Sequence, residues 1–405
     1  MKILQICPKV PFSPKDGGSL AMNILTEGLI SQGNIVHVLA ISTPQYFIKE
    51  ETIEVDYRNK TNYQSVYIDT SVKAFPAFLN LFSSKSYNVI RFYSKEFEEA
   101  LIQRLSSEQY DVIQLESIFV TPYLATIRKH STAKVILRSH NVEFMIWERL
   151  TKNTESGFKR MYLNFLFKRL KKYELGLLNK YDAIATITEL DAMIYKKEGC
   201  VLPMITIPFG IDVEKYKIDN SKIEKFSLFH LGAMDWRPNI DGITWFLKNS
   251  WMKIVAKHPS AKLYLAGRNM PDELYKLNVS GSESLSNVTI EGEITNAHRF
   301  INSKSIMIVP LQSGGGMRVK IIEGMALSKA IVSTTIGAEG IDCESKKNIL
   351  IADSEQEFID AIDKCLSDSE FSEMIGKNAR RLVETKYDNQ LISNKLSDFY
   401  KSLLN

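Results

Sequence analysis

The sequence predicts an α/β protein built from two doubly wound parallel sheets. Short apolar runs of strand length alternate with helical spans along the whole chain, which is the pattern of parallel strands joined by crossover helices. A length of 405 residues suits two domains of ordinary size. The rhythm breaks at Pro208 to Asp212 and in the polar stretch that follows, which favours an interdomain linker there.

The first half opens with a βαβ unit. The sequence predicts a strand over Lys2 to Cys7, a helix from about Ser19 to Ser31 and a strand over Ile35 to Ala40. Further strands are expected over residues 66–69, 111–116, 134–139, 181–188 and 204–208. Gly17 and Gly18 stand at the helix entrance, where unpaired N–H groups can cradle an anion. Their spacing is not GxGxxG, which argues against a nicotinamide enzyme.

Polar residues follow the predicted strand over residues 134–139. His140, Asn141 and Glu143 come directly after it, at the edge where open α/β sheets bind ligands. We expect them to line a binding site in the first domain. The alternative for His140 is a helix cap without chemistry.

Two segments of the first half allow two interpretations each. Residues 74–82, AFPAFLNLF, suit an acceptor-side loop with exposed aromatic rings or packed helix–turn structure. The segment Phe158 to Lys172 has six basic residues and no acidic one, and its aromatic and leucine side chains can share one helix face. It suits a helix lying on an anionic membrane, or an ordinary amphipathic helix whose apolar stripe is buried.

Bulk properties favour a cytoplasmic protein with an anionic partner. Residues 1–210 carry 26 Lys and Arg against 21 Asp and Glu, a balance of +5, whereas the remainder carries 25 against 26, a balance of −1. The asymmetry favours a membrane surface or a phosphorylated acceptor over nucleic acid. The four cysteines are scattered without metal-like spacing, and neither a secretion signal nor a run of about 20 apolar residues is visible. Any membrane contact is therefore expected to be peripheral.

The second half repeats the alternation, and its most informative stretch is Ser313 to Gly340. The apolar strand Ser305 to Leu311 ends in three glycines, after which a helix is predicted over Met317 to Leu327. Strand, glycine loop and helix N-terminus together form an anion site, to which Arg318 and Lys320 add positive charge. Glu323 could accept hydrogen bonds from sugar hydroxyls, so the stretch suggests a nucleotide-sugar. The alternative for the whole stretch is a glycine-rich connection between a strand and a helix that binds no ligand. The alternative for Lys320 and Glu323 is an ion pair on the helix surface.

With these motifs in view, the chain resembles the family 4 glycosyltransferases, which are retaining nucleotide-sugar enzymes of GT-B fold. Six segments carry the resemblance in order along the chain. They are the early DGGS loop, SHNVE, PFGID, LGAMDWRPNIDGI, VTIEGEI, and SGGGMRVKIIEGMALSKAIVST with GAEGI behind it.

The resemblance implies two Rossmann-like domains facing across a cleft. Residues 1–208 would form the acceptor-side domain, with 388–405 crossing back onto it, and residues 209–387 would bind the donor. Three residues would act in catalysis: Arg237, Lys320 and His140. Donor binding would involve Glu323 at the ribose, the diphosphate loop and the nucleobase segment: Gly232, Gly315, Gly316, Met317, Arg318, Val319, Glu293 and Ile294. The acceptor side would include Gly17, Gly18, Asn141 and Glu143.

The chain departs from the family pattern at two positions. Many members carry a second glutamate eight residues before the one matching Glu323, and here that position is Gly315. The linker has Phe209 where an asparagine is common. Recognition of the transferred sugar therefore does not follow from the resemblance.

The function that follows is transfer of a sugar, with retained anomeric configuration, from a UDP- or GDP-linked donor to an acceptor hydroxyl. The acceptor would be a carbohydrate, a lipid-linked molecule or a protein in cell-surface assembly, and no metal or other cofactor is expected. Two alternatives stay open. One is a GT-B-fold sugar-nucleotide epimerase, and the other is a non-catalytic protein that binds nucleotide-sugars.

Overall fold

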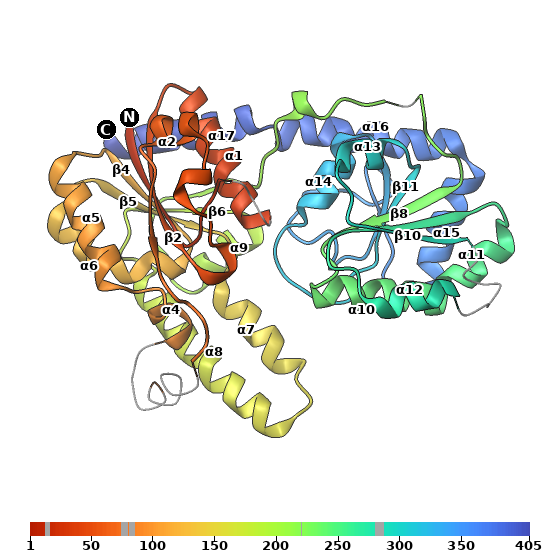
Figure 1. Ribbon diagram of the computed structural model, residues 1–405, viewed down its shortest axis with the longest axis horizontal. Coiled ribbons are helices and arrows are strands. Elements are labelled where there is room, and N and C mark those ends of the chain that lie inside the picture. Colours follow the sequence, from red (N-terminus) through yellow and green to blue (C-terminus); the bar gives the residue numbers. More distant parts are fainter. Residues whose placement is uncertain (13–16, 74–79, 81–85, 220, 280–286) are drawn as a thin grey trace. The chain divides into compact units, whose positions relative to one another are not determined.

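The computed structural model describes residues 1–12, 17–73, 80, 86–219, 221–279 and 287–405 (Figure 1). The chain forms two compact units. Unit 1 consists of Met1–Gly210 and Asn389–Asn405, and unit 2 consists of Ile211–Asp388. The divisions predicted from the sequence lie within two residues of these, after residues 208 and 387.

Unit 1 contains a seven-stranded sheet in the order β3-β2-β1-β4-β5-β6-β7, and every strand pair in it is parallel. Its strands are β1 (Lys2–Cys7), β2 (Ile35–Ser42), β3 (Gln64–Tyr67), β4 (Val112–Glu116), β5 (Lys134–Ser139), β6 (Ala183–Thr186) and β7 (Met204–Thr206). The central strands are buried on both faces, which explains the apolar runs in their sequences, while Gln5, Gln114, Glu116 and Arg138 are buried polar exceptions.

Helices cover both faces of this sheet. The C-terminal helix α17 (Asn389–Leu404) packs with α1 (Gly17–Ser31) on one face, and α5 (Lys95–Ser107) and α6 (Leu124–His130) pack on the other (Figure 1). The Tyr400 hydroxyl of α17 donates to Gln114 Oε1 (2.5 Å), and Asn389 Nδ2 donates to the Ile24 carbonyl (2.9 Å). The last helix is therefore an integral part of unit 1. The remaining helices are α2 (Val55–Thr61), α4 (Tyr87–Ile90), α7 (Glu143–Lys152), α8 (Gly157–Leu177) and α9 (Glu189–Lys197).

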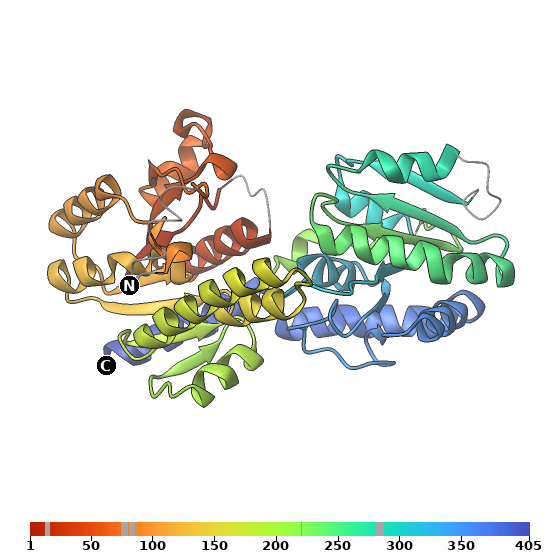
Figure 2. The same cartoon turned by 90° about the horizontal axis from the view of Figure 1, so that it is seen from below.

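Helices α7 and α8 form a hairpin that extends away from the sheet of unit 1 (Figures 1 and 2). The apolar face predicted over Phe158 to Lys172 divides along it. Leu166 and Leu170 are buried, whereas Phe158 is 86% exposed and Tyr162 is 41% exposed. The helix is therefore an ordinary packed helix at its base and an uncovered amphipathic one at its tip.

Unit 2 contains a six-stranded parallel sheet in the order β10-β9-β8-β11-β12-β13. Its strands are β8 (Ser227–Leu231), β9 (Lys262–Ala266), β10 (Val288–Gly292), β11 (Ile306–Val309), β12 (Ala330–Ser333) and β13 (Leu350–Ile351). Its helices are α10 (Arg237–Phe246), α11 (Met252–Lys257), α12 (Asp272–Val279), α13 (Ala297–Asn302), α14 (Val319–Ala326), α15 (Glu355–Ser367) and α16 (Ser369–Lys386).

The two faces of the second sheet have separate cores. Apolar side chains of α10 and α15 pack on one face, where Phe246 meets Phe358 with ring centroids 6.0 Å apart. On the opposite face, α14 comes so close that a Cβ on Gly324 would lie 2.7 Å from Met307 Sδ. The prediction of two doubly wound parallel sheets is confirmed.

Three sequence-based expectations need comment. The stretch after Pro208, predicted as an interdomain linker, contains the division between the units, and Ile211 at the start of unit 2 is fully buried and pairs with Asp388. The helix predicted from Met317 begins at Val319, since Arg318 has extended dihedral angles (φ −89°, ψ 96°). The interpretations of residues 74–82 lie outside the described residues, except for Asn80. Among the described residues, no helix is long and apolar enough to cross a membrane.

Candidate donor site and acceptor cavity

Each sheet has a point where its strand order reverses. In unit 2 the chain starts at the central strand β8 and adds β9 and β10 on one side of it. It then returns to the other side of β8, where it adds β11, β12 and β13. Gly232 follows β8, and the glycine loop Ser313 to Met317 follows β11. The predicted donor-binding motifs therefore lie at the neighbouring carboxyl ends where doubly wound sheets bind ligands.

Lys320 lies at the centre of this arrangement. Its Nζ donates to Asn239 Oδ1 (2.7 Å) and lies 3.2 Å from His230 Nε2. His230 Nδ1 lies 3.0 Å from the Ile308 carbonyl, and only a protonated Nδ1 can donate to it, which leaves Nε2 as the acceptor for Lys320. Burial, with the charge of Lys320, lowers the pKa of His230 well below its ordinary value. The amine is thus held by two uncharged groups.

The charged form of Lys320 is costly in this position. Burial, and then the nearby Arg318, lower the pKa of Lys320 to about 7. A bound anion would reverse this effect by favouring the ammonium form. The alternative of an ion pair between Lys320 and Glu323 is not what the structure forms, because Glu323 pairs with Tyr216 instead.

Gly232 provides the space that this cluster needs. A Cβ at this position would lie 2.8 Å from Asn239 Nδ2 and 2.9 Å from Lys320 Nζ. Gly267, which follows the neighbouring strand β9, approaches it so closely that its own Cβ would lie 1.7 Å from the Gly232 carbonyl oxygen. A side chain at either glycine would therefore displace the groups around the lysine.

Arg318 holds the glycine loop together. Its guanidinium donates to the carbonyls of Gly315 and Gly316 and lies 5.1 Å from the ring centroid of Trp236. Gly314 and Gly316 have φ angles of 115° and 83°, which are left-handed conformations that glycine adopts without strain. The predicted donor-binding residue Arg318 is thus buried within the loop and shapes it.

The N-terminus of α14 faces the same loop region. Arg318 occupies the N-cap position without a side-chain hydrogen bond to the helix. First-turn N–H groups that lack a side-chain cap are suited to hold an anion. Met317 and Val319 flank this N-cap, as the predicted diphosphate cradle requires.

Glu323, one turn further along α14, is oriented by a tyrosine. The Tyr216 hydroxyl donates to Glu323 Oε1 (3.0 Å), and the Tyr216 ring packs against the His298 ring with centroids 4.3 Å apart. Burial raises the pKa of Glu323, while the bond from Tyr216 opposes that rise. Tyr216 is not among the predicted site residues, because it lies in the polar stretch after Asp212 that resembles an interdomain linker.

The remaining predicted donor residues are at the edges of this group. Glu293 and Ile294 follow β10 and precede α13; Glu293 is exposed and Ile294 half-buried. Arg237 opens α10, where its side chain is 79% exposed and forms an ion pair with Asp241 (2.8 Å). The structure therefore brings Asn239, and not Arg237, of the DWRPN motif to Lys320.

In unit 1, His140 belongs to a buried charge network beneath the sheet edge. Glu116 Oε2 lies 2.5 Å from His140 Nε2 and 3.1 Å from Arg138 Nη1. Burial alone would raise the pKa of Glu116, but Arg138 and then the bond from His140 lower it to about 2. Burial lowers the pKa of His140, which favours the neutral imidazole at pH 7. Its Nε2 lies 2.5 Å from Glu116 Oε2 and 3.1 Å from Arg138 Nη1, and the shorter contact assigns the proton to Nε2, which leaves Nδ1 as the acceptor.

A cavity of about 670 Å³ opens at the switch point of this first sheet, between the ends of β1 and β4. It brings together four of the predicted residues, which are Gly18, His140, Asn141 and Glu143. Other parts of its wall come from residues that the sequence analysis did not single out, including Lys9, Tyr46, Arg91, Phe92 and Phe119. Gly17 begins α1 beside this wall.

Glu143 carries an unusual carboxyl group. Burial, and then the neighbouring Glu174, raise the pKa of Glu143 to about 8. Glu174 is fixed by the N–H groups of Glu143 and Phe144 (3.2 and 3.0 Å) and by the Tyr195 hydroxyl (2.7 Å). At neutral pH the Glu143 side chain is therefore mostly protonated and can donate a hydrogen bond into the cavity.

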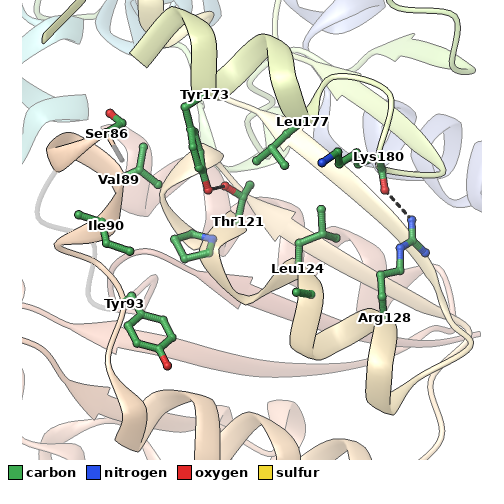
Figure 3. Close-up of a pocket in the computed structure, with 12 residues that line it drawn as sticks. Ser86, Val89, Ile90, Tyr93, Thr121, Leu124, Arg128, Tyr173, Leu177 and Lys180 are labelled. Atoms are coloured by element: carbon green, nitrogen blue, oxygen red, sulfur yellow. Dashed lines mark hydrogen bonds between the residues drawn. The ribbon is translucent and has the colours of Figure 1, made fainter. Parts of the chain in front are cut away.

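A second cavity of unit 1, of about 600 Å³, lies among α4, α6 and α8 (Figure 3). Its wall is mainly apolar. The Tyr173 hydroxyl is 2.9 Å from Thr121 Oγ1, and Arg128 donates to the Lys180 carbonyl at one end (Figure 3). None of the predicted site residues lines it.

Comparisons with known proteins agree with this architecture. Residues 225–368 match the family described as glycosyl transferases group 1. An uncharacterized 44.6 kDa protein in the cps region of Klebsiella pneumoniae is 22% identical over 402 residues, covering 96% of this chain and 97% of that protein. A capsular polysaccharide biosynthesis glycosyltransferase of Staphylococcus aureus, CapM, is 26% identical over 210 residues, covering 48% and 53%.

Solved structures share the fold over the full length. HepE of Anabaena, in complex with UDP, superposes with a TM-score of 0.67 at 13% identity and covers 99% of this chain and 100% of its own. Sucrose-phosphate synthase of Thermosynechococcus elongatus gives 0.70 at 14% identity, covering 100% and 99%. Residues 225–368 therefore resemble the group 1 glycosyl transferases, and the chain as a whole shares the GT-B fold of these solved structures.

Proposed function

We propose that this protein is a retaining, family 4 glycosyltransferase that moves a sugar from a nucleoside diphosphate sugar to an acceptor hydroxyl in cell-surface polysaccharide, glycolipid or glycoprotein assembly. The observation that carries the proposal is the buried amine of Lys320, whose hydrogen-bond partners among the described residues, Asn239 and His230, are both neutral. Beside it stand an uncapped helix N-terminus and a carboxylate, Glu323, one turn away. This set complements a diphosphate joined to a ribose.

The proposed chemistry places positive charge where the leaving group becomes negative. As the bond from the sugar to the diphosphate breaks, Lys320 and the N–H groups at the start of α14 stabilise the departing phosphate oxygens. Arg237 is proposed as a further cation for the diphosphate, which requires it to leave Asp241. In a front-side attack the leaving phosphate itself accepts the acceptor's proton, so neutral His140 is proposed to orient the hydroxyl through Nδ1 rather than to abstract its proton. No metal is invoked.

Ligands bound in solved structures of the same fold support the choice of donor class and acceptor class. Structures of HepE hold UDP and UDP-glucose, and a TarM variant of Staphylococcus aureus holds UDP together with α-GlcNAc-glycerol. We therefore propose a UDP-sugar as the first donor to test and a GDP-sugar as the second. The transferred sugar is left to the experiment, because Gly315 replaces the second glutamate of the family pattern.

A thermal-shift screen with UDP, GDP, ADP and their sugars tests donor binding, because a ligand of the native state stabilises it by mass action. The stabilising nucleotide should have no effect on Glu323→Ala. Turnover with candidate acceptors, followed by NMR assignment of the anomer, then tests retention. A new free sugar formed without acceptor would instead identify an epimerase, and binding without any turnover would identify a non-catalytic binder.

We also propose that unit 1 docks on the inner face of the cytoplasmic membrane through the tip of the α7–α8 hairpin. Phe158 and Met161 are 86% and 67% exposed there, beside the basic residues Lys159 and Arg160. Exposed apolar side chains ringed by cations suit an anionic lipid surface. The protein should sediment with vesicles containing phosphatidylglycerol, and Phe158→Ser/Met161→Ser should release it; equal binding to neutral vesicles would contradict the proposal.

A further inference from the structure

The cavity at the switch point of unit 1 contains two cations. Lys9, in the loop after β1, places its Nζ 4.7 Å from the ring centroid of Tyr46. Arg91, directly after α4, places its guanidinium 5.3 Å from the ring centroid of Phe92. Both residues line the cavity, together with the rings that they pack against.

Arg91 is only partly satisfied by the protein. Its Nε is buried and has no hydrogen-bond partner among the described residues. Burial lowers the pKa of its guanidinium, which means that desolvation of this charge outweighs its attraction to the described residues around it. A buried guanidinium edge of this kind is suited to a ligand oxygen.

The described wall of this cavity carries little negative charge. Glu143 is the one acidic residue in the described wall of this cavity, and its pKa of about 8 leaves it mostly uncharged at pH 7. Glu116, which lies behind His140, is already compensated by Arg138. The described wall therefore presents net positive charge at neutral pH.

An aromatic surface accompanies the cations. The rings of Phe92 and Phe119 stack with centroids 4.8 Å apart and planes inclined by 26°, and both residues line the cavity. Flat aromatic faces suit the C–H surface of a sugar ring, and the neutral Glu143 and His140 supply a donor and an acceptor for its hydroxyls.

We propose that this cavity binds an anionic group, a phosphate or a carboxylate, that belongs to the carbohydrate acceptor. The proposal rests on the proposed function, in which unit 1 receives the acceptor. It adds a charge requirement to the acceptor, with Lys9 and Arg91 as the residues that impose it.

The test is isothermal titration of the full-length protein with inorganic pyrophosphate, carried out with UDP already saturating. We expect binding to persist under UDP and to weaken at least about tenfold in Lys9→Gln/Arg91→Gln, because each cation makes a charge-assisted hydrogen bond. Lys152→Gln/Lys197→Gln is the matched control, since it removes two exposed cations of the same unit that no proposed site uses. Two results would overturn the proposal. One is that saturating UDP abolishes pyrophosphate binding, and the other is that the double variant binds pyrophosphate as tightly as the wild type.

Two further arms complete the design. Titration with glucuronate, compared with pyrophosphate, shows whether the site prefers a carboxylate or a phosphate, and glucose is the neutral control. Either preference supports the proposal if the binding depends on Lys9 and Arg91. Should the double variant misfold, Lys9→Gln alone and Arg91→Lys take its place. UDP binding, measured separately, reports on the proposed donor site, so its failure is distinguishable from a failure of the anion site.

Discussion

At the scale of single residues, Lys320 ties nucleotide binding to pH. Its pKa of about 7 means that the amine is partly neutral without ligand, and a diphosphate should restore the ammonium form. Binding of UDP at pH 8 should therefore take up a fraction of a proton, and affinity should fall as pH rises above 7. Titration calorimetry in buffers of different ionisation enthalpy measures this uptake.

The comparison for this experiment is Lys320→Met, which keeps an unbranched side chain of nearly the same length and removes the charge. Its residual binding should show no such proton uptake. Equal proton uptake in the variant and the wild type would mean that another group titrates.

Tyr216 should matter to nucleotide binding although no part of the family resemblance includes it. Tyr216→Phe removes one hydrogen bond to Glu323, worth about 1 kcal/mol, so affinity for UDP should fall about fivefold. Tyr264→Phe is the matched control, because its hydroxyl makes the same kind of bond to Glu224 (2.8 Å) away from the glycine loop. Equal effects of the two variants would refute an orienting role for Tyr216.

Glu143 should make the protein less stable as pH rises. Its folded pKa of about 8 lies above the ordinary value of 4.5, so the unfolded state binds fewer protons than the folded state between these values. The contribution of Glu143 to the free energy of unfolding is therefore greatest below pH 4.5 and is lost as the pH rises toward 8. Melting curves of Glu143→Gln should decline less over this range than those of the wild type, whereas exposed Glu155→Gln should follow the wild type.

At the scale of helices and strands, the sequence predicted most of what the structure contains. The strands around residues 2–7, 134–139 and 305–311 were recognisable because strands buried on both faces contain runs of apolar residues. The glycine loop was recognisable because its residues are consecutive. Asn239 and His230 were not, since their role depends on contacts with Lys320 from 81 and 90 residues away. Such contacts are set by tertiary packing, which no local pattern encodes.

The packing of α1 against α17 gives a prediction at this scale. A Cβ on Gly28 would lie 1.9 Å from Ser393 Oγ and 2.6 Å from Asn389 Nδ2. Gly28→Ala should therefore force the helices apart and cost about 1–3 kcal/mol in the free energy of unfolding. Gly176→Ala in α8, where nothing lies within 4 Å of the added methyl group, should instead be neutral or stabilising. Chemical denaturation measures both.

At the scale of the whole molecule, the chain passes between its units twice. It leaves unit 1 after Gly210 and returns to it at Asn389, so the C-terminal helix stabilises a unit encoded almost 180 residues earlier. Unit 2 lies between these points, and its proposed nucleotide site uses residues of unit 2 alone: Lys320, Glu323, Tyr216 and the glycine loop. Two units with separate cores need not have the same stability.

The nucleotide should therefore stabilise the two units unequally. UDP at about 100 times its dissociation constant should add about 2.7 kcal/mol to the stability of the unit that binds it. Hydrogen exchange should slow most in β8, β11 and α14, with a smaller change in the strands of unit 1. In Glu323→Ala this protection should disappear while exchange without nucleotide stays the same. Protection confined to unit 1 would show that the nucleotide binds at the cavity beside His140, and the assignment of donor and acceptor sides would then have to be exchanged.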